Sequence, residues 1–151
     1  MPVSLENLLK IGRLKEHPPD AEEIQRLLAA AKRNLADARV KAISAETRFD
    51  AAYKSIMQAA LAALMAHGYR PDSKSPGHHL TVVQGLVHTI GLDATRVRVL
   101  DALRRVRNVS DYSGEDIADS SAEECIKEAE RLHGDVMNWL RANRPKLAAP
   151  Q

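Results

Sequence analysis

The sequence contains few aromatic residues: phenylalanine, tryptophan and tyrosine together make up 3% of its 151 residues. Its core must therefore be built mainly from Leu, Ala, Val and Ile. This favours closely packed helices over a β-sheet, because sheets use more aromatic and β-branched side chains. The net charge is only +2, which is too small to imply binding of nucleic acid by the whole surface. Any polyanion would need a local basic patch.

Cysteine and long apolar runs are also scarce. Cys125 is the single cysteine, which excludes an intramolecular disulfide and the usual zinc-site spacings, and we expect it to be buried on the last helix. The longest apolar run, "IMQAALAALMA", is too short to span a bilayer. The N-terminal residues lack a basic stretch followed by an apolar one. We therefore expect a cytoplasmic protein that does not contact membranes.

Apolar residues recur at helical spacing along most of the chain and predict an all-α fold without strands. Long helices are expected at 20–43, 45–67, 93–108 and 121–142, with shorter ones at 5–11 and 79–91. All but the helix over 79–91 have a residue suited to cap the start, namely Ser4, Asp20, Ser44, Asp93 and Ser121, with Glu23 and Glu124 completing capping boxes. Residues 45–67 are apolar on nearly every face, which is typical of a central helix.

These helices predict an up-and-down four-helix bundle with additional short helices. The bundle is expected to be a single domain over residues 1–143, and the remaining residues 144–151 are expected to form a frayed tail.

Basic residues gather toward the end of the helix predicted over 93–108. Arg104 and Arg107 share a helix face because they are three residues apart, whereas Arg105 lies off that face. Two converging guanidiniums can hold a phosphate, but cations near a helix C-terminus also simply complement the helix dipole. Asn108 is a common helix-ending residue, and Tyr112 is expected in the following turn, where its ring could pack on the bundle. Spacing alone does not decide between a site and a helix end.

Two histidine patterns have features of metal or proton-transfer sites. His78 and His79 are adjacent, so on a helix they point about 100° apart and cannot chelate a metal together, although either could act as a general base in a cleft. Glu130 and His133 have half the spacing of a di-iron carboxylate site, but the other long helices offer no second Glu-x-x-His. We therefore expect no metal, and His133 is expected to be a partly exposed residue of the bundle.

The motif Arg107-Asn108-x-x-x-Tyr112 resembles the signature region of HEPN domains (higher eukaryotes and prokaryotes nucleotide-binding). The similarity is wider, with "LADARVKAISAETRFDAAYKSIMQAALAALMAHGYRP", "GHH" and "RNVSDY" resembling a bacterial branch of these proteins over residues 5 to 140. The resemblance implies a helical bundle that forms a homodimer. It also implies, in many members, a metal-independent ribonuclease of toxin–antitoxin or phage-defence systems that needs no cofactor.

In the family motif, the arginine holds the scissile phosphate and a histidine four to six residues later transfers a proton. Arg107 and Asn108 match this motif, and Tyr112 stands at the histidine position. Because the pKa of tyrosine is about 10 and that of histidine about 6.5, Tyr112 is a poor base at neutral pH unless nearby arginines lower its pKa. The resemblance thus implies a site at Arg107, Asn108 and Tyr112. Further nucleic-acid contacts are expected at Arg104, Arg105 and His79.

Three hypotheses remain at this point. The first is a homodimeric protein that binds RNA or nucleotide, either as a ribonuclease or without cutting the RNA. The second is a non-catalytic module that acts through a partner, such as a nucleotidyltransferase or a cognate antitoxin. The third is a structural helical adaptor, which predicts that Arg104, Arg107 and Tyr112 are locked in ion pairs or core contacts without an open cleft.

Overall fold

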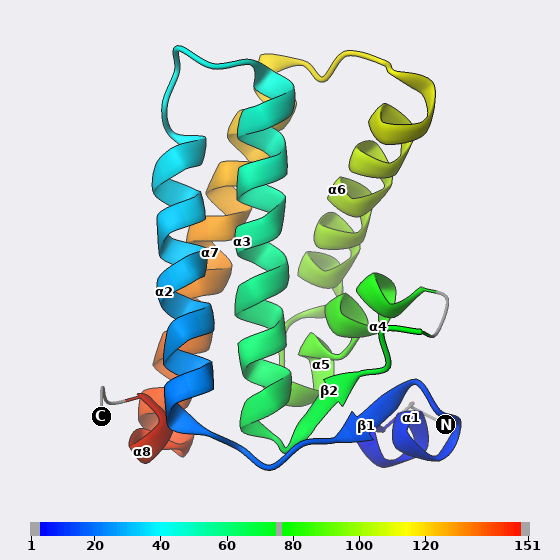
Figure 1. Ribbon diagram of the computed structural model, residues 1–151, viewed down its shortest axis with the longest axis vertical. Coiled ribbons are helices and arrows are strands. Elements are labelled where there is room, and N and C mark those ends of the chain that lie inside the picture. Colours follow the sequence, from blue (N-terminus) through cyan, green and yellow to red (C-terminus); the bar gives the residue numbers. More distant parts are fainter. Residues whose placement is uncertain (1–3, 75–76, 149–151) are drawn as a thin grey trace.

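Four long helices make up most of the computed structural model, which describes residues 4–74 and 77–148. They are α2 (Ala21–Ala38), α3 (Ala45–Ala66), α6 (Ala94–Ser113) and α7 (Asp119–Asn143). The shorter elements are α1 (Leu5–Lys10), β1 (Leu14–Glu16), β2 (Tyr69–Pro71), α4 (His78–Gln84), α5 (Leu86–Thr89) and α8 (Pro145–Ala148). The long helices alternate in direction along the chain, and α4 and α5 lie between α3 and α6 (Figure 1). The predicted all-α fold is confirmed.

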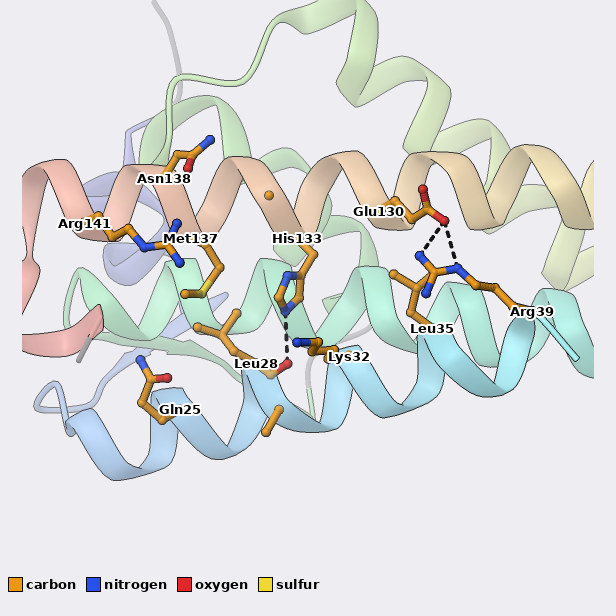
Figure 2. Close-up of a pocket in the computed structure, with 12 residues that line it drawn as sticks. Gln25, Leu28, Lys32, Leu35, Arg39, Glu130, His133, Met137, Asn138 and Arg141 are labelled. Atoms are coloured by element: carbon orange, nitrogen blue, oxygen red, sulfur yellow. Dashed lines mark hydrogen bonds and ion pairs between the residues drawn. The ribbon is translucent and has the colours of Figure 1, made fainter. Parts of the chain in front are cut away.

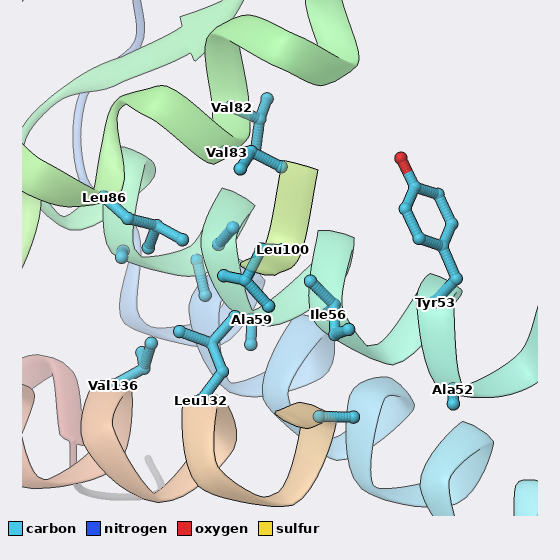
Figure 3. Packing of buried hydrophobic residues seen from close by; sticks show 14 of the residues in the cluster. Ala52, Tyr53, Ile56, Ala59, Val82, Val83, Leu86, Leu100, Leu132 and Val136 are labelled. Carbon is cyan, nitrogen blue, oxygen red and sulfur yellow. The ribbon is translucent and has the colours of Figure 1, made fainter. Parts of the chain in front are cut away.

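Helix α3 is central, as its nearly continuous apolar sequence predicts. Ser44 caps it by accepting a hydrogen bond from the backbone N–H of Thr47 at 3.2 Å. Its buried residues lie on several faces, so that α2 and α7 both pack against it. Figure 3 shows Ile56 and Ala59 of α3 close to Leu132 of α7. The many alanines of α3 allow this close approach, because small side chains bring helix axes together.

Helix α6 packs differently along its length. Its buried residues are Val97, Leu100 and Leu103, and none of its residues after Leu103 is buried. Helix α4 lies against α6 and α3, and Figure 1 shows α6 leaning away from α3 toward its C-terminal end. The C-terminal half of α6 therefore carries its polar side chains along the surface.

The end of α2 and the start of α7 differ from the sequence prediction. Helix α2 ends at Ala38 instead of continuing to about residue 43. Buried Arg48 explains this early end: its Nε donates to the carbonyl of Ala38 at 2.8 Å and its Nη2 donates to Glu123 at 2.7 Å. Helix α7 begins at Asp119 with Ala118 as its N-cap, so the predicted capping box of Ser121 and Glu124 is wrong.

The helix predicted over 79–91 is divided into α4 and α5 at Gly85. Glycine is a poor helix former, which favours a break at this position.

The predicted N-caps of three long helices are correct, namely Asp20 of α2, Ser44 of α3 and Asp93 of α6. Asp20 accepts from the N–H groups of Glu22 and Glu23, although the Glu23 side chain bonds His17 at 3.1 Å instead of completing a capping box.

The expectation of no strand is wrong for two short segments. Strands β1 and β2 pair antiparallel, with Leu14 opposite Pro71 and Glu16 opposite Tyr69. Each has only three residues, too few to produce an alternating pattern in the sequence. Their pairing holds buried Leu14 against the core and ties the N-terminal segment to the end of α3.

In place of a frayed tail from residue 144, residues 145–148 form the short helix α8, while residues 149–151 lie outside the described residues. The Gln25 side chain of α2 donates to the carbonyl of Leu147 at 2.5 Å, and Leu147 packs against the core. In the part of the chain that the structure describes, no helix combines the length and apolar character that crossing a bilayer requires.

Candidate functional site

The whole motif is helical and lies in the C-terminal part of α6. The helix predicted over 93–108 continues to Ser113, and Gly114, with φ of 71°, ends it by donating its N–H to the carbonyl of Ser110 at 2.9 Å. Tyr112 consequently lies in the last helical turn and is 91% exposed. The sequence allowed its ring to pack on the bundle, but in the structure the ring is exposed to solvent.

An open cleft of about 590 Å³ lies between the start of α4 and the C-terminal half of α6. Helix α6 lines it with Arg104, Arg107, Asn108, Asp111 and Tyr112, which recur at helical spacing. His79 is among the α4 residues on the opposite side, together with Gly77, His78 and Leu80. The fold thus brings five of the six residues predicted for the site around one cleft.

Arg105 is the predicted residue that the fold directs elsewhere. It lines a separate depression with Val106, Val109 and Ile117. Its side chain is 73% exposed, and its Nη2 forms an ion pair with Asp101 at 3.0 Å. Arg104 donates to the same carboxylate through its Nε at 2.8 Å. In contrast to Arg105, its side chain is only 18% exposed and lines the cleft.

The guanidinium of Arg107 is positioned by an aromatic ring from α3. Its Cζ lies 5.0 Å from the centre of the Tyr53 ring, within the range of a cation–π interaction. Its Nε lies 3.8 Å from carboxylate oxygens of both Asp50 and Asp111, too far for a hydrogen bond. The guanidinium forms no hydrogen bond with any residue in 4–74 or 77–148. Its N–H groups are therefore available to a ligand in the cleft.

Tyr53 also holds the histidine on the other side of the cleft. Its hydroxyl lies 3.3 Å from Nδ1 of His79. Burial raises the pKa of Tyr53 to about 12, although Arg107 and Arg104 act in the opposite direction, so the hydroxyl stays neutral. Burial lowers the pKa of His79, and the nearby His78, Arg107 and Arg104 lower it further. His79 therefore enters the cleft as a neutral imidazole at pH 7, able to accept a proton.

The pKa of Asp50, on α3 near Arg107, is shifted in opposite directions by burial and by neighbouring charges. Burial raises the pKa of its carboxyl group, and Asp111 adds to this, while the positive charge of Arg107 opposes both. Asp50 and Tyr53 were missed as site residues because the sequence shows them only as members of a long apolar helix. The contact between α4 and α6 that assembles the cleft has no local sequence signal.

The residues weighed as metal ligands have other partners. Glu130 pairs with Arg39 at 2.5 Å, and His133 is hydrogen-bonded through Nε2 to the carbonyl of Leu28 at 3.1 Å. His133 is partly exposed, as predicted. Among the described residues, no group of three or more His, Cys, Asp or Glu side chains could hold a metal ion.

The chain was compared with curated proteins and with models of protein families. No curated protein matches the chain. The family model for the HEPN domain matches residues 24–139, which is well over half of the chain and includes every residue that lines the cleft. The chain therefore belongs to the HEPN domain family.

Proposed function

We propose that this HEPN protein binds RNA and holds a phosphate of the RNA backbone in the cleft between α4 and α6. One observation carries the proposal: the Arg107 guanidinium is supported on the Tyr53 ring and faces the cleft without a hydrogen bond to the described residues. A planar guanidinium can donate two parallel hydrogen bonds to a phosphate, which makes arginine well suited to this role.

The surroundings of Arg107 support a phosphate over a neutral ligand. Arg104 adds a second cation on the same helix face, and Asn108 adds an amide that can donate to a phosphate or a 2′-hydroxyl. Exposed Tyr112 lies at the rim, where an unpaired base could stack on its ring. A structural adaptor predicts that Arg104, Arg107 and Tyr112 are locked in ion pairs or core contacts without an open cleft. Arg104 and Arg107 do lie beside carboxylates, but the cleft is open and Tyr112 is exposed.

A second candidate function is metal-independent cleavage of RNA, favoured by the presence of His79 in the cleft. Tyr112 occupies the motif position of the usual histidine but lies exposed at the rim. In this reaction neutral His79 takes the proton of a 2′-hydroxyl, whose oxygen attacks the adjacent phosphorus. The bond from phosphorus to the 5′-oxygen breaks, and a proton passes to that oxygen, leaving a cyclic phosphate and a 5′-hydroxyl.

We further propose that the protein acts as a homodimer in the cytoplasm, with the outer face of α6 as the interface. Val106 and Val109 on this face are 37% and 49% exposed. Joining two copies of α6 would bury these valines and bring two clefts close together. A cognate antitoxin or nucleotidyltransferase stays a prediction of the family resemblance, and an absence of RNA binding would favour it.

Fluorescence anisotropy with labelled single-stranded RNA in EDTA tests the binding function. We expect Arg107→Ala to weaken binding by about 1.5–3 kcal/mol, or roughly 10- to 100-fold, because a charge-assisted contact is lost. Arg105→Ala is the matched control, since Arg105 lies on the same helix but outside the cleft, and we expect a change of less than about threefold. Equal effects of the two substitutions would contradict a phosphate site at Arg107.

Gel electrophoresis of the same RNA tests cleavage separately. We expect His79→Asn to abolish cleavage while RNA affinity stays within about threefold of wild type. Tyr112→Phe keeps an aromatic ring at the rim and is expected to retain both properties. If wild-type protein binds RNA in EDTA without cutting it, the ribonuclease proposal is rejected and the binding proposal stands.

A further inference from the structure

A groove of about 540 Å³ lies between α2 and α7, away from the cleft (Figure 2). Both helices pack more extensively on α3 than on each other, and this leaves a channel between them on the outside of the bundle. The lining residues extend from Gln25 to Arg39 on α2 and from Glu130 to Arg141 on α7. At 1.5 Å per residue, the α2 side is about 20 Å long, which matches a helix of three to four turns.

The groove has an apolar floor and a basic rim. Leu28 and Leu35 of α2 lie at the bottom but are only 3% and 5% exposed, so the apolar surface open to a partner comes mainly from Ala29 of α2 and Met137 of α7. Figure 2 shows Leu28 and Met137 lying between the two helices. The cationic lining residues are Lys32, Arg39 and Arg141, against a single acidic one, Glu130, which pairs with Arg39. Within the described part of the chain, neither Lys32 nor Arg141 forms an ion pair. The rim therefore has positive charge available to an acidic partner.

Gly134 lies in the middle of α7 and lines this groove. A glycine inside a helix lowers helix stability relative to alanine, so its position requires a reason. A Cβ added at Gly134 would meet no described heavy atom within 4 Å, so packing within the described chain does not require a glycine. Close approach of another chain along the groove would require one, because a side chain at this position would project into the channel.

We propose that this groove binds an amphipathic helix of a partner protein, with apolar residues against the floor and acidic residues beside the rim. A helix lying parallel to α2 and α7 would present side chains three and four residues apart to Ala29 and Met137, above the buried Leu28. Asp or Glu residues on its flanks would meet Lys32 and Arg141. RNA fits this groove less well, since no Phe, Tyr or Trp among the described residues lines it for base stacking.

Selection from a display library of 14-residue helical peptides tests the proposal, with the full-length protein as the target and Gly134→Leu as the counter-target. We expect enriched peptides to carry apolar residues at helical spacing flanked by Asp and Glu. Anisotropy with the most enriched peptide should show binding weakened about tenfold or more by Gly134→Leu and by the double substitution Lys32→Glu and Arg141→Glu.

Controls separate a filled groove from other effects. Glu124→Leu adds a similar side chain to an exposed position of α7 that does not line the groove; it should leave peptide affinity within about twofold of wild type. Arg107→Ala should also leave it unchanged, so that failure of the RNA-binding proposal does not affect this test. Circular dichroism establishes that every variant is folded, and Gly134→Ala, which fills the groove least, serves as a second variant.

Several results would overturn the proposal. The first is that no peptide is enriched. The second is that the enriched peptides are basic or uniformly apolar. The third is that they bind Gly134→Leu as tightly as they bind wild type. A wild-type dimer that becomes a monomer in Gly134→Leu would show that a second copy of this chain occupies the groove. If Gly134→Leu weakens RNA binding as strongly as Arg107→Ala does, the groove is part of the RNA surface.

Discussion

The guanidinium carbon of Arg107 lies 5.0 Å above the centre of the Tyr53 ring. Because Tyr53 is only 2% exposed and belongs to the central helix α3, this contact ties the motif arginine to the rigid core. The hydroxyl of the same ring lies 3.3 Å from His79 of α4, and Figure 3 shows the ring extending away from the aliphatic core residues. One tyrosine thus positions side chains from both walls of the cleft.

This relationship predicts different effects of two substitutions at Tyr53 on RNA affinity. Tyr53→Phe keeps the ring under Arg107 and should bind RNA within about twofold of wild type. Tyr53→Leu removes the ring and should weaken binding by about 0.5–2 kcal/mol, roughly two- to thirtyfold, because Arg107 loses its support. Fluorescence anisotropy measures both, and equal affinities of the Phe and Leu variants would contradict a positioning role for the ring.

The pKa values of two histidines predict how stability depends on pH. Burial lowers the pKa of His67, whose ring lies 4.9 Å from that of Trp139, and burial also lowers the pKa of His79. In the unfolded chain both return to about 6.5 and bind protons more readily. The contribution of the two neutral histidines to stability is thus complete above about pH 6.5 and decreases as the pH falls through their lowered folded-state pKa values.

Thermal unfolding followed from pH 7.5 to 5.5 measures this dependence. We expect the melting temperature to fall with pH over this range, and the fall should be smaller in a variant that combines His67→Gln with His79→Asn. NMR titration of the imidazole protons should give pKa values below 6.5 for both residues. A melting temperature that rises as the pH falls would contradict the predicted direction.

Local signals made parts of the fold predictable. Ser4, Asp20, Ser44 and Asp93 each accept a hydrogen bond from a backbone N–H two or three residues later, so the sequence around each is sufficient to predict the helix start. The end of α2 depends instead on Arg48, which bonds Ala38 and, on α7, Glu123. A contact between residues so far apart in the chain leaves no periodic pattern.

The residues of the site likewise include some that the sequence predicts and others that it does not. Arg107 and Asn108 could be predicted because they match the family motif, and Arg104 because it shares a helix face with Arg107; their spacing alone does not distinguish a site from a helix end. Tyr53 could not, since an aromatic residue in an apolar stripe looks the same whether its ring fills the core or supports an arginine. The predicted place of Tyr112 is wrong because the turn-forming residues after Asn108 suggest a helix end, whereas in the structure they stay helical up to Ser113.

The proposed homodimer predicts that a charge on the outer face of α6 dissociates it. We expect wild-type protein to show twice its chain mass of 16.6 kDa in size-exclusion chromatography with light scattering, and Val109→Glu to shift it toward the monomer. Burying a carboxylate in an apolar interface is unfavourable, which gives the direction of the effect. Val40→Glu is the matched control, because Val40 is 48% exposed but lies beyond the end of α2. A wild-type monomer, or dissociation by both substitutions, would contradict this interface.

Arg48 predicts a large loss of stability from one substitution outside the cleft. Its side chain is 6% exposed and joins the C-terminal carbonyl of Ala38 to Glu123 of α7. Arg48→Ala leaves that carbonyl without its donor, so we expect the free energy of unfolding to fall by about 1.5–3 kcal/mol. Arg39→Ala is the control: it removes an exposed ion pair with Glu130 and should cost about 0–1 kcal/mol. Urea unfolding measures both, and similar losses for the two variants would show that the buried bond adds nothing beyond a surface pair.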